Sequence, residues 1–388
     1  MLKWVQGGLS AVTGIAEPEY GPEYIHSITD TVKDKQHFQI ATKQDFKWQS
    51  PTSTNVETQT FYFNDLTTGI IGFAQVIHSN VVGIHTTAQF TFKLFNTNTK
   101  EQIWTSTKLE DFIIKGENFY ASNLKIEIND EGNEYHLVSK VNPESIVDLK
   151  FSKIAPSVKI GKDGVTIYGD DVENPWGTMR HVFWPRNKVE GSIQSTKEGS
   201  TETKNYEING FSMFVMALQG MKPHHAAATW NFLNFHSKSL STVVMEFTTP
   251  KSYGSTKVSL AFLSNDEGII GSSINNEVLH LNPEIDEVGW PKPTSLEFKG
   301  HGIDSKANDE QVQSGSAKPV EWTLKGGLQL VERVDVMHEI PNFVKNLVSG
   351  VAGTKPYIYQ FWDNMTIEYN EIKETSIGYL EATFITEL

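Results

Sequence analysis

Three histidines that lie close together in the sequence are the first residues with a possible chemical role. His224 and His225 are adjacent, and His236 follows within the same segment. A zinc site needs three or four ligands in tetrahedral geometry, and no HExxH helix accompanies these residues. We therefore expect no metal here. The aromatic residues nearby are Trp230, Phe232 and Phe235.

Together, the aromatic rings could form the apolar wall of a binding site, and the histidine nitrogens could be its polar groups. Neutral imidazole can donate from one nitrogen and accept at the other, so His224 or His225 could meet a hydroxyl or amide of a bound molecule. Packing in an ordinary core explains the same pattern equally well, and both interpretations stay open.

No set of residues predicts a catalytic centre. The carboxylate pairs Asp170-Asp171 and Asp266-Glu267 lie in turn-like sequence, where solvation explains them. There is no phosphate-binding loop with lysine and no GxSxG motif. The chain has no cysteine, which excludes thiolate catalysis and favours a reducing compartment. We expect no enzyme and no cofactor.

Alternation of apolar and polar residues predicts that most of the chain is β-strand. Between residues 84 and 94, Phe90, Phe92 and Leu94 alternate with polar residues that end at Lys93, as in a strand with one face buried and the other wet. Similar runs recur with turn residues between them, and the main internal helix expected is short, at 341–348. The sequence indicates an all-β protein of sandwich or barrel type.

The chain length of 388 residues favours about two domains. A polar, low-complexity stretch at 192–205 precedes an apolar one, which indicates a boundary near residue 210. We expect four parts: an amphipathic helix at 1–16, a tether at 17–35, a first β-domain at 36–210 and a second at 211–388.

The segment 211–218 is apolar on both alternating faces and includes Phe211, Met213 and Met216. A surface strand would have one wet face, so this pattern predicts a second module or a lipid beyond the outer face of the strand. The methionines would provide adaptable walls for an irregular chain.

Residues 1–16 predict an amphipathic helix that binds a membrane surface. At about 100° per residue, the bulky apolar side chains share one half of the helical wheel, and the other half is nearly uncharged. Adsorption would therefore rest on insertion into lipid-packing defects rather than on attraction to anionic lipid. Packing of this helix on the protein's own barrel is the alternative. The membrane-binding residues expected are Met1, Leu2, Trp4, Val5, Leu9, Val12 and Ile15.

Charge excludes one class of partner. The formal net charge is −14, and the only arginines are Arg180, Arg186 and Arg333. Such a chain is poorly suited to neutralise phosphates, so we expect no nucleic-acid partner.

Three long stretches of the sequence are specific enough to compare with a known family. They are MLKWVQGGLSAVTGIAEPEYGPEYIHS at 1–27, FSMFVMALQGMKPHHAAATWNFLNFHSKS at 211–239 and LVERVDVMHEIPNFVKNLVSGVAGTKPYIYQF at 330–361. They closely resemble the fungal survival factor (Svf) family, and the likeness extends across essentially the whole chain. The resemblance implies two lipocalin-like barrels in tandem, in a cytoplasmic protein held peripherally on endoplasmic reticulum and Golgi membranes. It also implies a role in survival under stress and non-vesicular transfer of ceramide.

Two other functions stay open beside a lipid carrier. Tandem lipocalin-like folds include hydratases of terpenoids, so an enzyme that modifies a lipid or terpenoid is one alternative. A membrane scaffold without ligand, its barrels filled by their own side chains, is the other. We expect the lipid in the second module, at Phe211, Met213, Met216, His224, His225, Trp230, Phe232 and Phe235.

Overall fold

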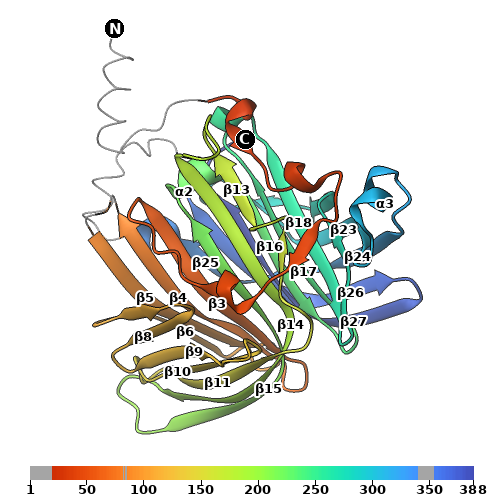
Figure 1. Cartoon of the computed structure of the whole chain (residues 1–388). Coiled ribbons are helices and arrows are strands. Elements are labelled where there is room, and N and C mark those ends of the chain that lie inside the picture. The colour runs from red at the N-terminus through yellow and green to blue at the C-terminus, as the bar shows by residue number, and fades with distance from the viewer. Residues whose placement is uncertain (1–19, 82, 84, 340–353) are drawn as a thin grey trace.

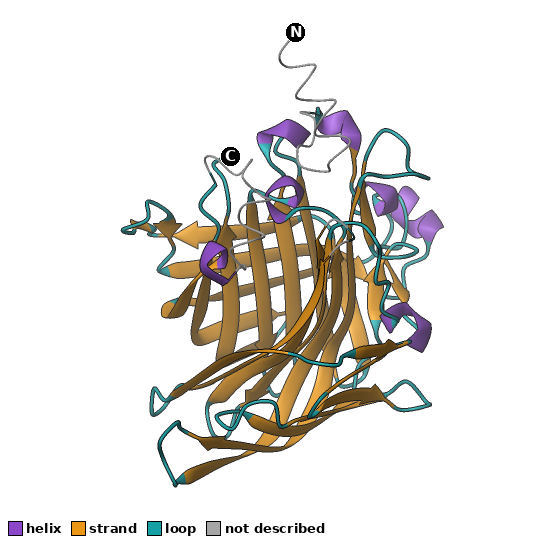
Figure 2. Cartoon of the chain, turned by 90° about the vertical axis from the view of Figure 1, so that its left-hand side faces the viewer, coloured by secondary structure: helices purple, strands orange, loops and turns teal. Residues whose placement is uncertain are grey.

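The computed structural model describes residues 20–81, 83, 85–339 and 354–388, and strands make up most of them (Figure 1). Helices are short and lie at the periphery of the strands (Figure 2). The expected helices at 1–16 and 341–348 lie outside the described residues. None of the helices within the described ranges is long and apolar enough to cross a membrane.

The first sheet is a curved, antiparallel half-barrel in the order β6-β5-β4-β3-β15-β14-β11-β10-β9-β8-β7. Its strands are β3 (Asn55–Asp65), β4 (Ile70–Val81), β5 (His85–Asn96), β6 (Gln102–Lys108), β7 (Ile113–Lys115), β8 (Asn118–Ala121), β9 (Leu124–Ile128), β10 (Glu134–Ser139), β11 (Ile146–Lys153), β14 (Gly177–Thr196) and β15 (Thr203–Gln219).

The second sheet closes into a barrel of eight strands, because β19 pairs with β23 as well as with β18. Around the barrel the order is β19-β18-β17-β16-β27-β26-β24-β23. Its strands are β16 (Thr229–His236), β17 (Ser241–Thr248), β18 (Lys257–Asn265), β19 (Gly268–Ser273), β23 (Ser295–Asp304), β24 (Pro319–Gly327), β26 (Tyr357–Tyr369) and β27 (Ile372–Phe384), and two further strands, β20 (Asn276–Leu281) and β25 (Gln329–Asp335), pair with β23 and β26.

The remaining elements are short. The strands are β1 (Ile25–His26), β2 (Phe38–Ile40), β12 (Val158–Ile160), β13 (Val165–Tyr168), β21 (Glu284–Ile285) and β22 (Pro291–Lys292), and the helices are η1 (Pro22–Tyr24), η2 (Asp30–Val32), η3 (Lys43–Phe46), η4 (Lys251–Tyr253), α2 (Pro223–Ala226), α3 (Asp309–Gln313) and α4 (Val336–Glu339). The predicted all-β fold of two lipocalin-like units is confirmed, the first unit being a half-barrel.

The expected boundary at residue 210 lies inside β15. The polar stretch at 192–205 is the end of the long β14–β15 hairpin, in which Gln194 pairs with Asn205. The hairpin end is polar because its side chains are largely exposed, and not because it links two domains. The chain passes from the half-barrel to the barrel between Gln219 and Thr229.

The described part of the expected tether is packed into the fold. Strand β1 pairs with β13, and Ile25, Ile28 and Val32 are buried. Gln36, directly after this segment, donates through Nε2 to the carbonyl of Ala307 at 2.8 Å, so the chain here also contacts the loop between β23 and α3. Residues 20–35 therefore belong to the folded body.

Buried apolar residues form three clusters. One fills the half-barrel, one fills the closed barrel, and the third lies between the outer faces of the two sheets. We call this third region the inter-sheet layer. It joins strands β3–β5 and β14–β15 of the half-barrel to β16–β18 and β26–β27 of the barrel.

Candidate functional site

Residues 211–218 of strand β15 are apolar on both faces because a packed layer lies on each side of them. Met213 faces the inter-sheet layer, whereas Met216 faces the interior of the half-barrel. The two residues are three apart, an odd number, so their side chains point to opposite faces of the strand. Of the two explanations offered for this pattern, a second module does lie beyond the outer face. The segment itself, however, belongs to the half-barrel.

Strand β16 divides its predicted residues in the same way. Trp230 and Phe232 are half-buried and pack against the inter-sheet layer, while Phe235 is fully buried inside the barrel. Phe232 stacks on Tyr62 of β3, with ring centroids 4.9 Å apart. Trp230 meets His181 of β14 edge to face at 6.0 Å. The sequence-predicted residues thus do not form one site, but Met213, Trp230 and Phe232 share the layer between the sheets.

A polar network lies across the barrel side of this layer. Register places Phe232, Glu381, Gln360 and Glu332 next to one another on β16, β27, β26 and β25. Glu381 accepts through Oε1 from Tyr379 Oη at 2.7 Å and from Gln360 Nε2 at 3.0 Å.

The half-barrel provides the cation of the network. Lys93 of β5 donates to Gln360 Oε1 at 2.7 Å and to Glu332 Oε2 at 3.0 Å, and its side chain is only 2% exposed. Gln102 donates to the same Glu332 oxygen at 2.6 Å. These bonds join strands that are far apart in the sequence, so sequence reasoning missed them. The one available signal was a charged residue between apolar neighbours, as at Glu381 between Leu380 and Ala382.

Burial shifts the ionisation of these groups. It raises the pKa of Glu381 and lowers that of Lys93, although the ion pair with Glu332 opposes the second shift. It also raises the pKa of Tyr62 and Tyr379 well above the usual value, so both phenols stay protonated and can donate. A buried carboxylate is costly unless hydrogen bonds compensate it, and these donors supply that compensation.

Above the network the two sheets do not cover each other completely. The next register row of the barrel consists of Trp230, Thr383, Ile358 and Val334, and all four are half-buried. On the half-barrel, Ala217 and its partner Thr58 are half-buried too. A closed core of this composition would leave almost no accessible side chain. This partly accessible, mainly apolar row therefore lies beside the polar network, which we call its polar floor, and small-molecule sites combine the same kinds of groups.

Phe211 has a different role, beside Arg186 and His236 at the seam where the two sheets are joined. The β14–β15 register shifts between Trp184 and Asn187, and this bulge directs Arg186 toward the barrel. The Arg186 guanidinium lies 4.0 Å from the centre of the Phe211 ring, and it donates to Ser241 Oγ at 2.8 Å. His236 Nδ1 contacts the same hydroxyl at 2.6 Å.

His224 and His225 lie on the short helix α2, and their ring centroids are 4.1 Å apart. Burial lowers the pKa of His224 to about 3, and the neighbouring His225 adds to the shift. Over the described ranges, no group of three histidine, aspartate or glutamate side chains is arranged to hold a metal ion.

A separate cavity of about 400 Å³ lies beside the seam. Its walls come from the β3–β4 turn, the β16–β17 turn and β26–β27, and include Lys238 and Glu374. Most of its lining residues are polar, so it is unsuited to an acyl chain. The predicted membrane-binding residues Met1, Leu2, Trp4, Val5, Leu9, Val12 and Ile15 lie outside the described residues.

Comparison with known proteins identifies the family. The Svf1 family model matches residues 2–386. The chain belongs to the Svf1 family. A Svf1-family relative from Debaryomyces hansenii, named a ceramide-binding protein, is 57% identical over 100% of both chains. Relatives of the same name from Candida albicans and Kluyveromyces lactis are 54% and 53% identical, over 100% of this chain and 100% and 97% of their own lengths.

Solved structures share the fold of this Svf1-family chain at low sequence identity. CghA superposes with a TM-score of 0.60 at 10% identity, over 86% of this chain and 89% of its own. Kievitone hydratase from Nectria haematococca superposes with a TM-score of 0.53 at 14% identity, over 89% and 94%. At these identities the likeness shows the tandem fold and nothing about activity.

Proposed function

We propose that this protein binds ceramide and carries it between membranes without vesicles. The observation that carries the proposal is identity of up to 57% across the whole chain, in the relatives described above, to proteins named for ceramide binding. The inter-sheet layer supports it. Its accessible apolar side chains can shield acyl chains from water at about 0.8 kcal/mol per methylene, and its polar floor can meet the head group.

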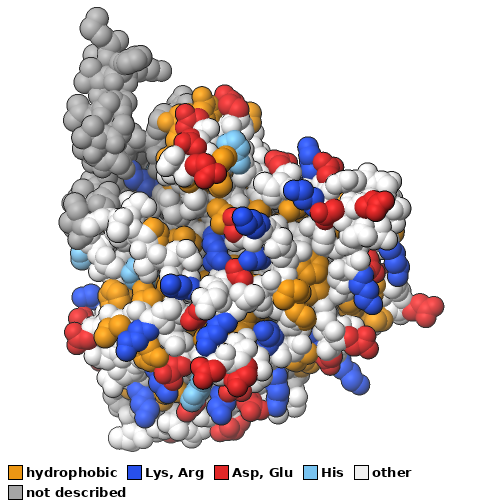
Figure 3. Space-filling model, viewed as in Figure 1, with side chains coloured by type: hydrophobic (Ala, Val, Ile, Leu, Met, Phe, Trp, Pro, Cys, Tyr) orange, Lys and Arg blue, Asp and Glu red, His pale blue; other side chains and the backbone are white. Residues whose placement is uncertain are grey.

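We further propose that the protein acts at endoplasmic reticulum and Golgi membranes from the cytoplasm, supports survival under stress, and docks through residues 1–16. Docking by apolar insertion suits the charge distribution. Basic and acidic side chains are interspersed over the face in Figure 3, without a continuous basic area that would attract anionic lipid.

Lipid extraction tests binding. The protein is purified from its native cells, and its lipids are extracted and identified by mass spectrometry. A ceramide near one molecule per protein is expected. Absence of any sphingolipid would contradict the proposal.

A transfer assay tests carriage. Donor vesicles with labelled ceramide are mixed with acceptor vesicles and substoichiometric protein, and the expected rate of transfer rises with protein concentration. Recovery of a chemically altered lipid, rather than ceramide itself, would instead favour an enzyme on the same fold.

A further inference from the structure

One carboxylate oxygen of the network under the accessible part of the inter-sheet layer is only weakly hydrogen-bonded. Glu381 Oε1 accepts two hydrogen bonds, at 2.7 and 3.0 Å, but within the described residues Oε2 accepts only from Tyr62 Oη, at 3.5 Å. A carboxylate offers about four acceptor positions and no donor when ionised. Its second oxygen therefore has room for a further hydrogen-bond donor.

Glu381 borders the accessible row of the inter-sheet layer. Glu381 is half-buried, and its cross-strand neighbour Phe232 is also half-buried. Trp230 and Thr383 are each two residues along their strands from Phe232 and Glu381, about 7 Å toward the accessible row. A molecule that enters along this row would therefore reach the carboxylate at its inner end.

On the basis of the proposed ceramide binding, we propose that Glu381 is the head-group contact and that the lipid enters head first. The second carboxylate oxygen accepts from a hydroxyl or amide N–H of an uncharged head group. The same site selects against lipids whose head group carries a phosphate.

Charge provides the selection. The network holds two carboxylates, Glu381 and Glu332, and one cation, Lys93, which is already bonded to Gln360 and Glu332. A phosphate brought to Glu381 would have to give up its hydration for a network whose described residues offer it a carboxylate and no cation besides Lys93. A hydroxyl or amide pays no comparable desolvation cost and supplies the missing donor.

The test compares ceramide with ceramide 1-phosphate of the same acyl chain. Both compete with a fluorescent ceramide for the purified full-length protein. The wild-type protein is expected to prefer ceramide by at least about tenfold. Glu381→Gln replaces an acceptor oxygen with an amide donor, so it is expected to lose about tenfold in ceramide affinity and most of the discrimination. Glu381→Asp keeps the charge but is shorter, so it is expected to lose affinity and keep discrimination.

Glu368→Gln is the matched control, because Glu368 is an exposed carboxylate on β26 paired with Lys373. It is expected to behave as the wild type. Wild-type affinity and discrimination in both Glu381 variants would overturn the head-group assignment while ceramide binding itself stands. A wild-type protein that binds neither lipid would instead overturn the proposed function.

Discussion

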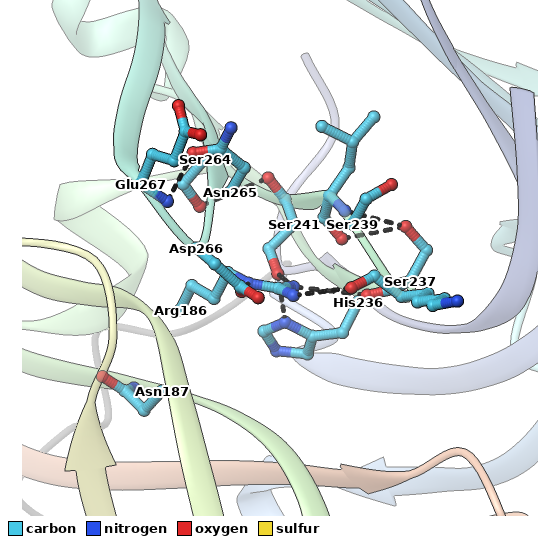
Figure 4. Close-up of polar contacts among 12 residues, drawn as sticks. Arg186, Asn187, His236, Ser237, Ser239, Ser241, Ser264, Asn265, Asp266 and Glu267 are labelled. Atoms are coloured by element: carbon cyan, nitrogen blue, oxygen red, sulfur yellow. Dashed lines mark hydrogen bonds and ion pairs between the residues drawn. The ribbon is translucent and has the colours of Figure 1, made fainter. Parts of the chain in front are cut away.

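Arg186 has no exposed surface, yet its Nε donates a 2.7 Å hydrogen bond to Asp266, whose side chain is 66% exposed. The bond joins the bulge of β14 to the β18–β19 turn, and the same guanidinium donates to the carbonyl of Lys238 at 2.9 Å. A single side chain of the half-barrel therefore fixes two turns of the barrel (Figure 4). Arg186 is therefore one of the contacts that hold the two sheets together, beside the apolar inter-sheet layer and the Lys93 network.

Replacing Arg186 with alanine should lower the free energy of unfolding by about 3 kcal/mol, because several buried acceptors lose their donor together. Lys188→Ala on the same strand is the control. Lys188 and its partner Glu190 are each about half exposed, and such pairs contribute about 1 kcal/mol or less. Urea unfolding followed by tryptophan fluorescence measures both. Equal losses would show that the seam bond is not important for stability.

The side chains of Trp230 and Phe235 point to opposite faces of β16, so shortening each of them to alanine should have different consequences. Trp230→Ala should lower bound ceramide per protein more than it lowers stability, since Trp230 is half-buried in the inter-sheet layer. Phe235→Ala should lower the free energy of unfolding by about 3 to 5 kcal/mol, since it leaves a cavity in the barrel core. Native mass spectrometry measures loading, and thermal unfolding measures stability.

The control for loading is His78→Ala, because His78 is buried against Trp48 in the half-barrel. It should leave ceramide loading of the folded protein unchanged. A loss of loading with His78→Ala as large as that with Trp230→Ala would move the ligand into the half-barrel.

Acid should destabilise the protein through its buried histidines. Burial lowers the pKa of His236 and His224 to about 3, and that of His181 and His280 to about 4. In the unfolded chain these groups bind protons near pH 6.5, so the stability they contribute is present above that pH and is lost as pH falls toward 4. Each group adds a slope of about 1.4 kcal/mol per pH unit in this window.

Urea midpoints between pH 7 and 4.5 measure this slope. His236→Asn should make the dependence of stability on pH shallower, while mutation of the exposed His85 should leave this dependence unchanged. A flat stability profile would contradict the neutral, buried state of these histidines.

Deleting residues 1–16 should release the protein from liposomes without lowering its melting temperature. The sequence predicts that this helix contributes its apolar face to lipid and not to a core. Flotation on a sucrose gradient measures the association. Undiminished flotation, or a large fall in melting temperature, would show that the segment packs on the protein.

Within that helix the effect of a charge should depend on the face that carries it. Leu9→Asp or Trp4→Glu should abolish flotation, because a carboxylate would enter the apolar region of the bilayer. Thr13→Ser lies on the polar face and should change little. Equal flotation of all three variants with liposomes, whether high or low, would contradict the amphipathic interpretation.

The sequence by itself determined the class of fold. Period-two alternation marks strands wherever it occurs, because successive side chains of a strand point to opposite faces whatever surrounds it. The sequence also showed that residues 211–218 are apolar on both faces, which predicted a second module or a lipid beyond the outer face of that strand. The family resemblance, carried by three long stretches, was confirmed over residues 2–386.

Only the tertiary structure decided what each face meets. Lys93 stands on the polar side of its strand, which the pattern predicts to be wet, yet it is buried because the barrel covers that side. Met213 and Met216 pack in different layers because a different set of strands covers each face of β15. Alternation tells which residues share a face, but not which other element packs on it, and the network of Lys93, Gln360 and Glu381 exists only because two sheets meet there.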